Sequence, residues 1–408
     1  MILLLLMTFT GVSVGQLGKA LLTPFHLLMG IFMGFIILFI RKGHFNLQTS
    51  LLLLIGYIVL ANTIIHPGSR ITSVIYSVVL SFEYVIMYQL LVRVKKAIIL
   101  KAFTIIMFAY LVNIFLGFVI SSAHLNIGQG IINVFYSVDG SSRPMGFSSE
   151  PSYAAFILSI TFLAFNHLRE HKVDKIMWQM LIAYLLSTLL MKSAYGFIFV
   201  AVNMLDWFLF YFKRMSFNLR IVFLLAALIF LFVTPFVLQN SKQESIVRLQ
   251  NVSSIMNDSS LEPKKKLAKL QEEDGSAYAR IGPTWLLIEA GDEIEVDWIL
   301  GAGAGEAGIF FKNFMAGVLV DGDEVEKLDM GLIPAFVFDY GFVGTGLLIL
   351  FFISCAYNLP LPYWVCLFLI LPNCNINTQL FWYAMLLYAY VSTVKQVKST
   401  TSLPPKYP

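Results

Sequence analysis

The feature that most constrains this chain is its series of long apolar runs separated by short polar connections. Only 13% of the 408 residues are charged, whereas soluble domains carry about 25%. A helix needs about 20 apolar residues to cross a bilayer, and most of the runs approach that length. The sequence therefore predicts an all-α polytopic membrane protein with about 12 transmembrane helices. The segments are 2–15, 21–40, 49–65, 71–92, 97–120, 151–168, 176–191, 195–212, 220–239, 342–358, 361–373 and 379–394.

Lysine and arginine residues gather in every second connection between these segments. Cytoplasmic loops are enriched in both residues, so these connections and both termini should lie inside. The alternate loops, which include 121–150 and the long segment after residue 240, should then lie outside. The basic connections hold Arg41 and Lys42, then Arg93, Lys95 and Lys96, then Arg169, Lys172 and Lys175, then Lys213, Arg214 and Arg220, then Lys395 and Lys398.

Residues 240–330 form one long polar segment with seventeen acidic and nine basic residues. A segment this polar cannot span a bilayer. We therefore expect three regions. Residues 1–239 would hold transmembrane helices 1–9 and the outer loop 121–150, and 240–341 would form a large outer loop with short helices and an interfacial helix. Residues 342–408 would hold transmembrane helices 10–12 and a cytoplasmic tail.

Local patterns predict the elements of the large outer loop. Pro263 is expected to begin a surface helix, and Pro283 to occupy the first turn of another. The GAGAGEAG run at 301–308 is expected to be a close-packed turn, because no strand precedes it as in a dinucleotide-binding loop. Residues 330–338 are expected to form the helix that lies at the membrane interface.

The stretch RPMGFSSEPSY, residues 143–153, places a cation and an anion at the mouth of a membrane span. Such charges are costly at the edge of hydrocarbon unless they are paired or used. Outside the membrane there is no ATP and no sugar nucleotide, so a glycosyl or phosphoryl donor must already be lipid-linked. Transfer from a lipid diphosphate needs cations for the leaving group and a base for the acceptor hydroxyl.

Arginine suits the first of these roles, because its planar guanidinium binds phosphate oxygens in pairs. Arg143 and Arg280 lie in predicted outer loops among glycine, serine and tyrosine residues, and they are the predicted substrate-binding cations. Lys192, between two closely spaced segments, is a further one. Arg70, also at a span end, is interpreted as a snorkelling residue.

Glu150 and Asp329 are the candidates for the catalytic base. Each precedes a predicted helix, so helix capping is the alternative role for both. Hydroxyl-bearing neighbours complete the predicted substrate-binding set, namely Ser152, Tyr153 and Tyr278.

No cluster of histidine, cysteine and acidic residues shows metal-ligand spacing, so no metal and no cofactor are predicted. The lysines at 264–266 are closely flanked by acidic residues and indicate a solvated helix, not a nucleic-acid site. Glu83 lies in the middle of a predicted span, where a carboxylate is a functional candidate by default. A hydrogen-bonding role toward the helix bundle is the favoured interpretation.

Taken in order, the motifs resemble a known family. RPMGFSSEPSYAAFILSI resembles the Arg-x-x-Gly-Phe-x-x-Glu-Pro-Ser segment of bacterial Wzy-type O-antigen and exopolysaccharide repeat-unit polymerases, and is most similar to those of colanic-acid-like polymers. SAYARIG, GAGAGEAG and GLIPAFVFDYGFVGTGLL follow in the family's order. Arg280 and Gly291 also fit an Arg-x10-Gly spacing of the family's outer loops, whereas Arg143 does not, because Ala154 stands at the matching position.

The resemblance implies an inverting, metal-independent glycosyltransferase of the GT-C type in the bacterial cytoplasmic (inner) membrane, with its active site facing the periplasm. The donor would be a growing glycan on undecaprenyl diphosphate, and the acceptor a single lipid-linked repeat. Arg143 and Arg280 match the family's diphosphate-binding arginines. The implied partners are membrane lipid, a Wzz-type chain-length regulator and a Wzx-type flippase, with no nucleic acid.

Two alternatives remain at this point. O-antigen ligases share the fold but carry a histidine just before the helix that matches 331–341, and here Met330 stands there. A lipid-linked oligosaccharide flippase of the major-facilitator kind would have its long loop inside, between spans six and seven. In this chain the long loop follows the ninth segment and is predicted to lie outside.

Overall fold

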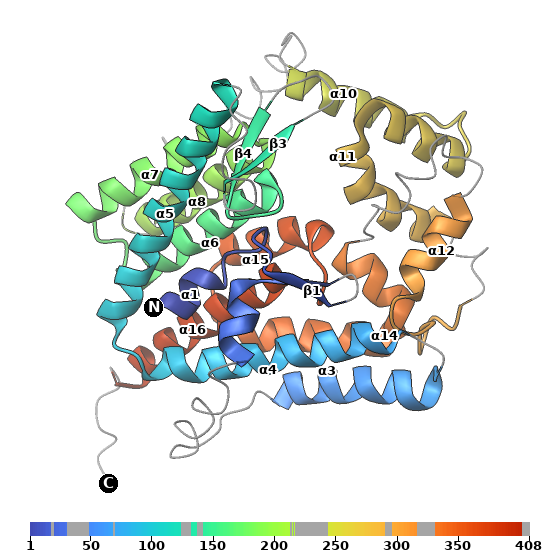
Figure 1. The fold of residues 1–408 in the computed structure, drawn as a ribbon, viewed down its shortest axis with the longest axis horizontal. Coiled ribbons are helices and arrows are strands. Elements are labelled where there is room, and N and C mark those ends of the chain that lie inside the picture. Colours follow the sequence, from blue (N-terminus) through green and yellow to red (C-terminus); the bar gives the residue numbers. More distant parts are fainter. Residues whose placement is uncertain are drawn as a thin grey trace.

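The computed structural model describes residues 1–17, 20–30, 49–67, 70–123, 132–136, 142–212, 214, 216, 244–289, 296–315 and 331–401. Most of the described residues are helical (Figure 1). Five described helices are long and apolar enough to cross a membrane, and three more are apolar but shorter. The five are α4 (Ile71–Arg93), α5 (Lys96–Ser122), α6 (Pro151–Leu168), α8 (Ala194–Phe212, apolar from Tyr195) and α14 (Leu332–Ala356).

The shorter apolar helices are α3 (Thr49–Leu60) with its π-helical extension η1 (Ala61–Ile65), α7 (Lys175–Met191) and α15 (Leu361–Ile370). These elements agree with the predicted class, an α-helical membrane protein, while the number of about 12 spans stays a prediction. The predicted span at 220–239 lies outside the described residues.

The helix α16 (Gln379–Thr401) is the centre of the bundle. It packs against α4, α6 and α14, and every side chain from 380 to 391 is buried. A helix that is apolar all round needs neighbours on every face. The bulk of this core comes from aromatic rings, including Trp382, Tyr383 and Tyr388, none of which has an exposed surface.

The predicted first span, 2–15, is wrong. The helix α1 covers only Ile2–Leu6, and five residues extend only about 7.5 Å. After Leu6 the backbone does not continue as a helix, because its carbonyl groups accept hydrogen bonds from side chains of other helices. The hydroxyl of Tyr110 on α5 donates to the carbonyl of Thr8 (2.6 Å), and Gln379 Nε2 donates to the carbonyls of Leu6 and Met7 (3.2 and 2.7 Å).

Two short antiparallel hairpins depart from the all-α prediction. Strands β1 (Gly15–Leu17) and β2 (Ala20–Leu22) form the first. The second lies in the predicted outer loop and pairs β3 (Asn133–Tyr136) with β4 (Ser142–Gly146), so that Phe135 faces Arg143 across the ladder. Strand β4 packs on α5, α6 and α7, which fixes the start of the RPMGFSSEPSY stretch against the bundle.

The described part of the large outer loop forms a smaller helical group with its own apolar core. It contains α10 (Glu244–Asn257), α11 (Pro263–Glu289) and α12 (Glu306–Met315), which lie together at one edge of the molecule (Figure 1). Pro263 begins α11 as predicted, but the same helix continues through Pro283, so the separate helix predicted from that proline is wrong.

A helix and the next span candidate follow one another at the predicted positions, with a break between them, while the location of the first part at the membrane interface stays a prediction. The helix α14 is interrupted at Gly341, where φ is 63° and ψ is −169°. Side chains from the first part, Ala335 and Phe338, pack into the core of the outer group, whereas Leu348 and Phe351 of the second part belong to the main core.

Candidate functional site

A cavity of about 170 Å³ lies where α4, α14, the glycine-rich turn before α12 and the loop before α16 meet. Arg70 stands at the start of α4, after a connection predicted to lie outside. The cavity is therefore at the outer end of the bundle in the predicted orientation. The residues that line it are Arg70, Ser73, Gly305, Ala307, Gly308, Ala335, Phe336, Asp339, Tyr340, Asn375, Ile376 and Asn377.

Asp339 holds one wall of this cavity in place. Its Oδ2 accepts a hydrogen bond from the Gly305 N–H, and its Oδ1 accepts one from the Ala307 N–H, both at 2.8 Å. Gly305 directly precedes α12 and Ala307 belongs to its first turn, where backbone N–H groups have no partner within the helix. A carboxylate is also favoured there by the helix dipole, so Asp339 joins α12 firmly to α14.

The GAGAGEAG run is a close-packed turn, as predicted. Gly301, Gly303 and Gly305 all have positive φ values, between 79° and 105°. The Ala302 N–H donates to the Phe338 carbonyl and the Gly303 N–H to the Asp339 carbonyl, both at 2.9 Å. A Cβ on Gly301 would lie 2.4 Å from the Asp339 carbonyl oxygen. The backbone of this turn thus packs directly against the backbone of α14, and this contact shapes the cavity wall.

Arg70 is anchored to this turn through the backbone. Its N–H donates to the Ala304 carbonyl at 3.2 Å, and the Ala304 N–H donates to Asn62 Oδ1 at 2.8 Å. The aliphatic part of the Arg70 side chain passes so close to Gly305 that a Cβ there would lie 2.9 Å from Arg70 Cδ. The packing therefore places the stem of Arg70 in the cavity lining, while the residue as a whole is exposed and its interpretation as a snorkelling residue stays a prediction.

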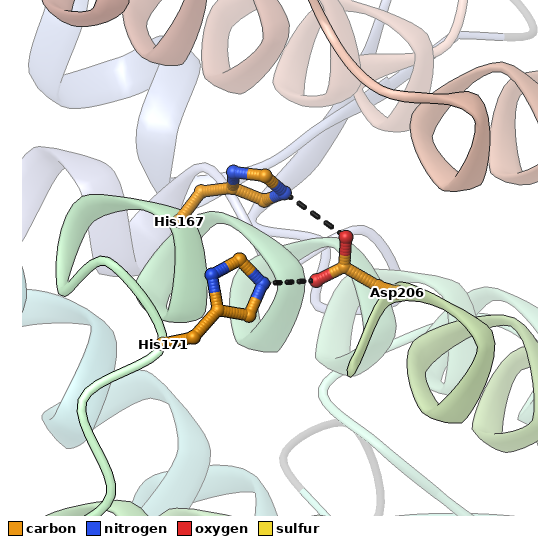
Figure 2. A group of neighbouring side chains, drawn as sticks. All are labelled: His167, His171 and Asp206. Carbon is orange, nitrogen blue, oxygen red and sulfur yellow. Dashed lines mark hydrogen bonds and ion pairs between the residues drawn. The ribbon is translucent and has the colours of Figure 1, made fainter. Parts of the chain in front are cut away.

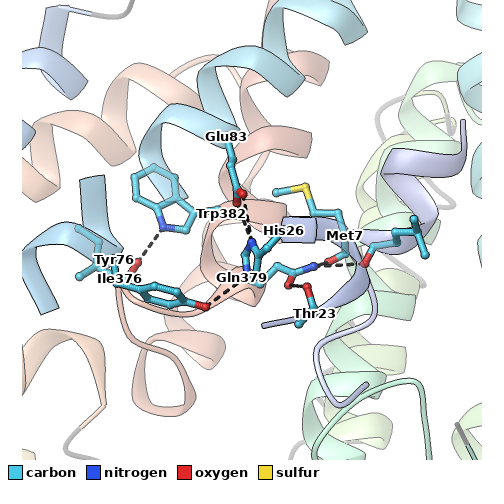
Figure 3. Close-up of polar contacts among 9 residues, drawn as sticks. Met7, Thr23, His26, Tyr76, Glu83, Ile376, Gln379 and Trp382 are labelled. Carbon is cyan, nitrogen blue, oxygen red and sulfur yellow. Dashed lines mark hydrogen bonds and ion pairs between the residues drawn. The ribbon is translucent and has the colours of Figure 1, made fainter. Parts of the chain in front are cut away.

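A polar network continues into the bundle below the cavity. Ser77, one turn after Ser73 on α4, donates to Asn377 Oδ1. Close by, Glu83 and Tyr76 bind opposite nitrogens of one imidazole ring (Figure 3). His26 Nδ1 lies 2.9 Å from Glu83 Oε2, and His26 Nε2 lies 3.2 Å from the Tyr76 hydroxyl.

Glu83 therefore has a partner that sequence reasoning missed. Both side chains of the pair are nearly inaccessible, with 7% exposure for His26 and 3% for Glu83. An intramembrane carboxylate needs a charged or hydrogen-bonding partner. In the sequence, the only indication of such a partner was a histidine in another apolar segment, 21–40. A separate polar contact is drawn beside it, in which Gln379 Oε1 accepts a hydrogen bond from the Thr23 hydroxyl at 2.8 Å (Figure 3).

The RPMGFSSEPSY stretch forms a second polar region, at the start of α6. Glu150 occupies the N-cap position of that helix, but its side chain makes no capping hydrogen bond. Its carboxylate instead accepts from the Ser152 hydroxyl at 2.9 Å. Arg143, Glu150 and Tyr153 are half-buried, whereas Ser152 is buried. Strand β4 thus brings four predicted site residues to one end of α6.

The other predicted site residues lie elsewhere. Tyr278 on α11 is fully buried in the core of the outer group, and burial raises the pKa of its phenol well above the usual range. Lys192 is exposed and ends α7 in the left-handed conformation, with φ of 49°. Arg280 belongs to α11, which packs against α10 and α14, whereas β4 packs against α5, α6 and α7. Asp329 lies outside the described residues.

At the opposite end of the bundle, two histidines and an aspartate meet. His167, His171 and Asp206 offer ligand atoms that all lie within 4.8 Å of one another (Figure 2). The absence of a metal thus stays a prediction, but the statement that no ligand cluster exists does not hold for the described residues. The spacing of four between the two histidines was a usable indication, whereas Asp206 is 35 residues further along the chain.

The chain was compared with protein-family models, with curated proteins and with solved structures. None of the three comparisons finds a match.

Proposed function

We propose that the protein is a polysaccharide polymerase. It would transfer a growing undecaprenyl-diphosphate-linked glycan to a new lipid-linked repeat unit at the outer face of the bacterial cytoplasmic membrane. The observation that carries the proposal is the cavity at the predicted outer helix ends, which combines one arginine with amide and hydroxyl groups. The order of the polymerase-like motifs supports the same assignment.

The cavity offers the groups that a lipid diphosphate and a sugar require. A guanidinium binds phosphate oxygens in fixed geometry, and Arg70 supplies one in the lining. Asn375 and Asn377 supply amide donors and acceptors suited to sugar hydroxyls. Asp339 uses both carboxylate oxygens on backbone N–H groups, so we assign it to positioning the wall and not to proton transfer.

The second polar region, at the start of α6, would take part in the same reaction at the outer face. In this proposal Arg143 and Arg280 assist in holding the diphosphate, and Glu150 or Asp329 takes the proton of the acceptor hydroxyl. The reaction would be inverting and would need no metal at the outer face. A Wzz-type chain-length regulator and a Wzx-type flippase are the expected partners.

Extension of a defined undecaprenyl-diphosphate repeat by the purified protein tests the proposal. The wild-type protein should convert the repeat into a ladder of longer lipid-linked glycans. Arg70→Lys should lower the rate about ten- to a hundredfold, because the loss of a charge-assisted contact costs about 1.5–3 kcal/mol when the contact forms in the transition state. Arg93→Lys, an exposed residue at the other end of the same helix, is the matched control.

The same assay separates the competing functions. If the purified protein extends no repeat, but transfers a finished glycan to a non-repeat acceptor, it is a ligase. If it moves the lipid-linked repeat across vesicle membranes without joining units, it is a flippase. Equal extension rates for Arg70→Lys and Arg93→Lys would remove the cavity from the mechanism and leave Arg143 and Arg280 as the diphosphate ligands.

A further inference from the structure

The cluster at the inner end of the bundle has a geometry that the proposed reaction does not use. His167 Nε2 lies 3.1 Å from Asp206 Oδ1, and His171 Nε2 lies 2.8 Å from Asp206 Oδ2. Figure 2 shows the two imidazoles pointing at the two oxygens of one carboxylate. The side chains are 9%, 3% and 3% exposed, in the order His167, His171 and Asp206.

The backbone is bent to bring His171 to this position. His167 is on the last turn of α6, and the chain then turns through Glu170 and His171, both with φ of 57°. Two successive non-glycine residues in the left-handed region are strained and need compensation from their surroundings. The His171 N–H donates to the Asn166 carbonyl at 3.0 Å, and its ring stacks on Phe210 with centroids 3.9 Å apart.

The three ligand atoms match the requirements of a tetrahedral zinc ion. Zinc takes histidine nitrogen and carboxylate oxygen at about 2.0–2.2 Å, so two ligand atoms of one ion lie roughly 3.4 Å apart. The distances of 3.1 and 2.8 Å run to two different oxygens of Asp206, and the three ligand atoms, one from each residue, lie within 4.8 Å of one another. Rotation of the side chains would bring these atoms to the zinc spacing. We propose that His167, His171 and Asp206 form a zinc site that joins the end of α6 to α8.

Several features separate this site from the cavity and from the proposed reaction. The site lies beside Arg169, Lys172 and Lys175, in the connection predicted to be cytoplasmic, and so at the other end of the spans from the cavity. Its buried ligands come from two helices and the turn between α6 and α7. The ring of Tyr363 on α15 lies 5.2 Å from that of His167, and its buried hydroxyl has no protein partner.

Metal content and cobalt binding of the full-length protein test this proposal. The protein is purified in detergent, its affinity tag is removed, and zinc is counted by mass spectrometry. We expect about one zinc ion per chain. After removal of the metal, titration with Co²⁺ should produce the visible absorption bands of tetrahedral cobalt at one equivalent. This measurement uses the wild-type chain and does not depend on how any variant folds.

Variants then assign the ligands. Loss of an outer-shell partner already lowers metal affinity about 10- to 100-fold, so His167→Gln and Asp206→Asn should weaken Co²⁺ binding by at least that factor. Added Zn²⁺ should raise the unfolding temperature of the wild type and leave that of Asp206→Asn unchanged. His66→Ala, a histidine outside the cluster, should bind like the wild type.

Two results would overturn the proposal. One is a wild-type protein that carries no zinc and gives no tetrahedral cobalt spectrum at micromolar metal, in which case Asp206 only bridges two imidazoles by hydrogen bonds. The other is Asp206→Asn that binds cobalt with wild-type affinity.

Discussion

The break in α14 offers a sharp test of how the outer cavity is built. Gly341 has φ of 63° and ψ of −169°, a conformation that is essentially restricted to glycine. A Cβ at this position would lie 2.3 Å from the carbonyl oxygen of Ile299 and 2.7 Å from the N–H nitrogen of Gly301. Both neighbours are backbone atoms, which cannot move aside as a flexible side chain can. Gly341→Ala should therefore separate α14 from the glycine-rich turn.

The expected cost follows from two contributions. A non-glycine residue in this conformation costs about 1–3 kcal/mol. The hydrogen bonds from the Phe342 N–H to the Trp298 carbonyl (2.8 Å) and from the Val343 N–H to the Ile299 carbonyl (3.2 Å) would be lost with the contact. Each contributes about 0.5–1.5 kcal/mol. The variant should thus be destabilised by about 2–6 kcal/mol.

Thermal unfolding of the purified protein in detergent, followed by intrinsic tryptophan fluorescence, measures this cost. Gly346→Ala is the matched control, because it lies on the same helix and a Cβ there meets no atom within 4 Å. Alanine is favoured over glycine inside a helix by about 1 kcal/mol, so the control should unfold at or slightly above the wild-type temperature. Equal unfolding temperatures for the two variants would refute the backbone contact between residues 299–301 and Gly341.

Three further predictions follow from the same structure. Asp339→Asn leaves one buried N–H of α12 without an acceptor and should lower stability by about 1–3 kcal/mol, measured by the same unfolding assay. Reporter fusions should place Asn257 outside and Lys398 inside the membrane, as the positive-inside rule requires, and a cytoplasmic signal at Asn257 would reverse the topology. Glu150→Gln should abolish glycan extension at normal protein level if Glu150 is the base, and substantial remaining activity would assign the proton transfer to another residue.

The sequence was sufficient to predict several of the apolar helices and their order. The segments 71–92, 97–120 and 151–168 became α4, α5 and α6 with ends displaced by at most three residues, because a run of apolar residues leaves few alternatives to a buried helix. The helix before Gly341 was predicted by the same kind of pattern. The break at Gly341, which separates this helix from the next span, depends on one contact between backbone atoms. The spacing of apolar residues in the sequence carries no information about that contact.

The cavity could not be predicted, because its lining comes from four distant parts of the chain. Arg70, Asp339 and Asn377 each look ordinary in their own segment: a residue at a span end, an acid in a helix, and an amide in a short loop. Their meeting follows from the packing of α4, α14 and α16 around a common core. The failure at 2–15 has a related cause, since Tyr110 and Gln379 lie far along the chain yet supply the hydrogen bonds that end α1.

The motif that first indicated a function is, in large part, a structural element. Along and just beyond β4, alternate residues are buried, namely Pro144, Gly146 and Ser148, whereas Arg143 and Phe147 are half-buried. A Cβ on Gly146 would lie 2.8 Å from the ring of Tyr110, and Ser148 hydrogen-bonds with the hydroxyl of that same tyrosine at 3.2 Å. A need for packing on α5 thus accounts for the glycine and for one serine of RPMGFSSEPSY. It does not account for Arg143 or for Glu150, whose side chain makes no capping hydrogen bond, so a functional role for these two residues stays a prediction.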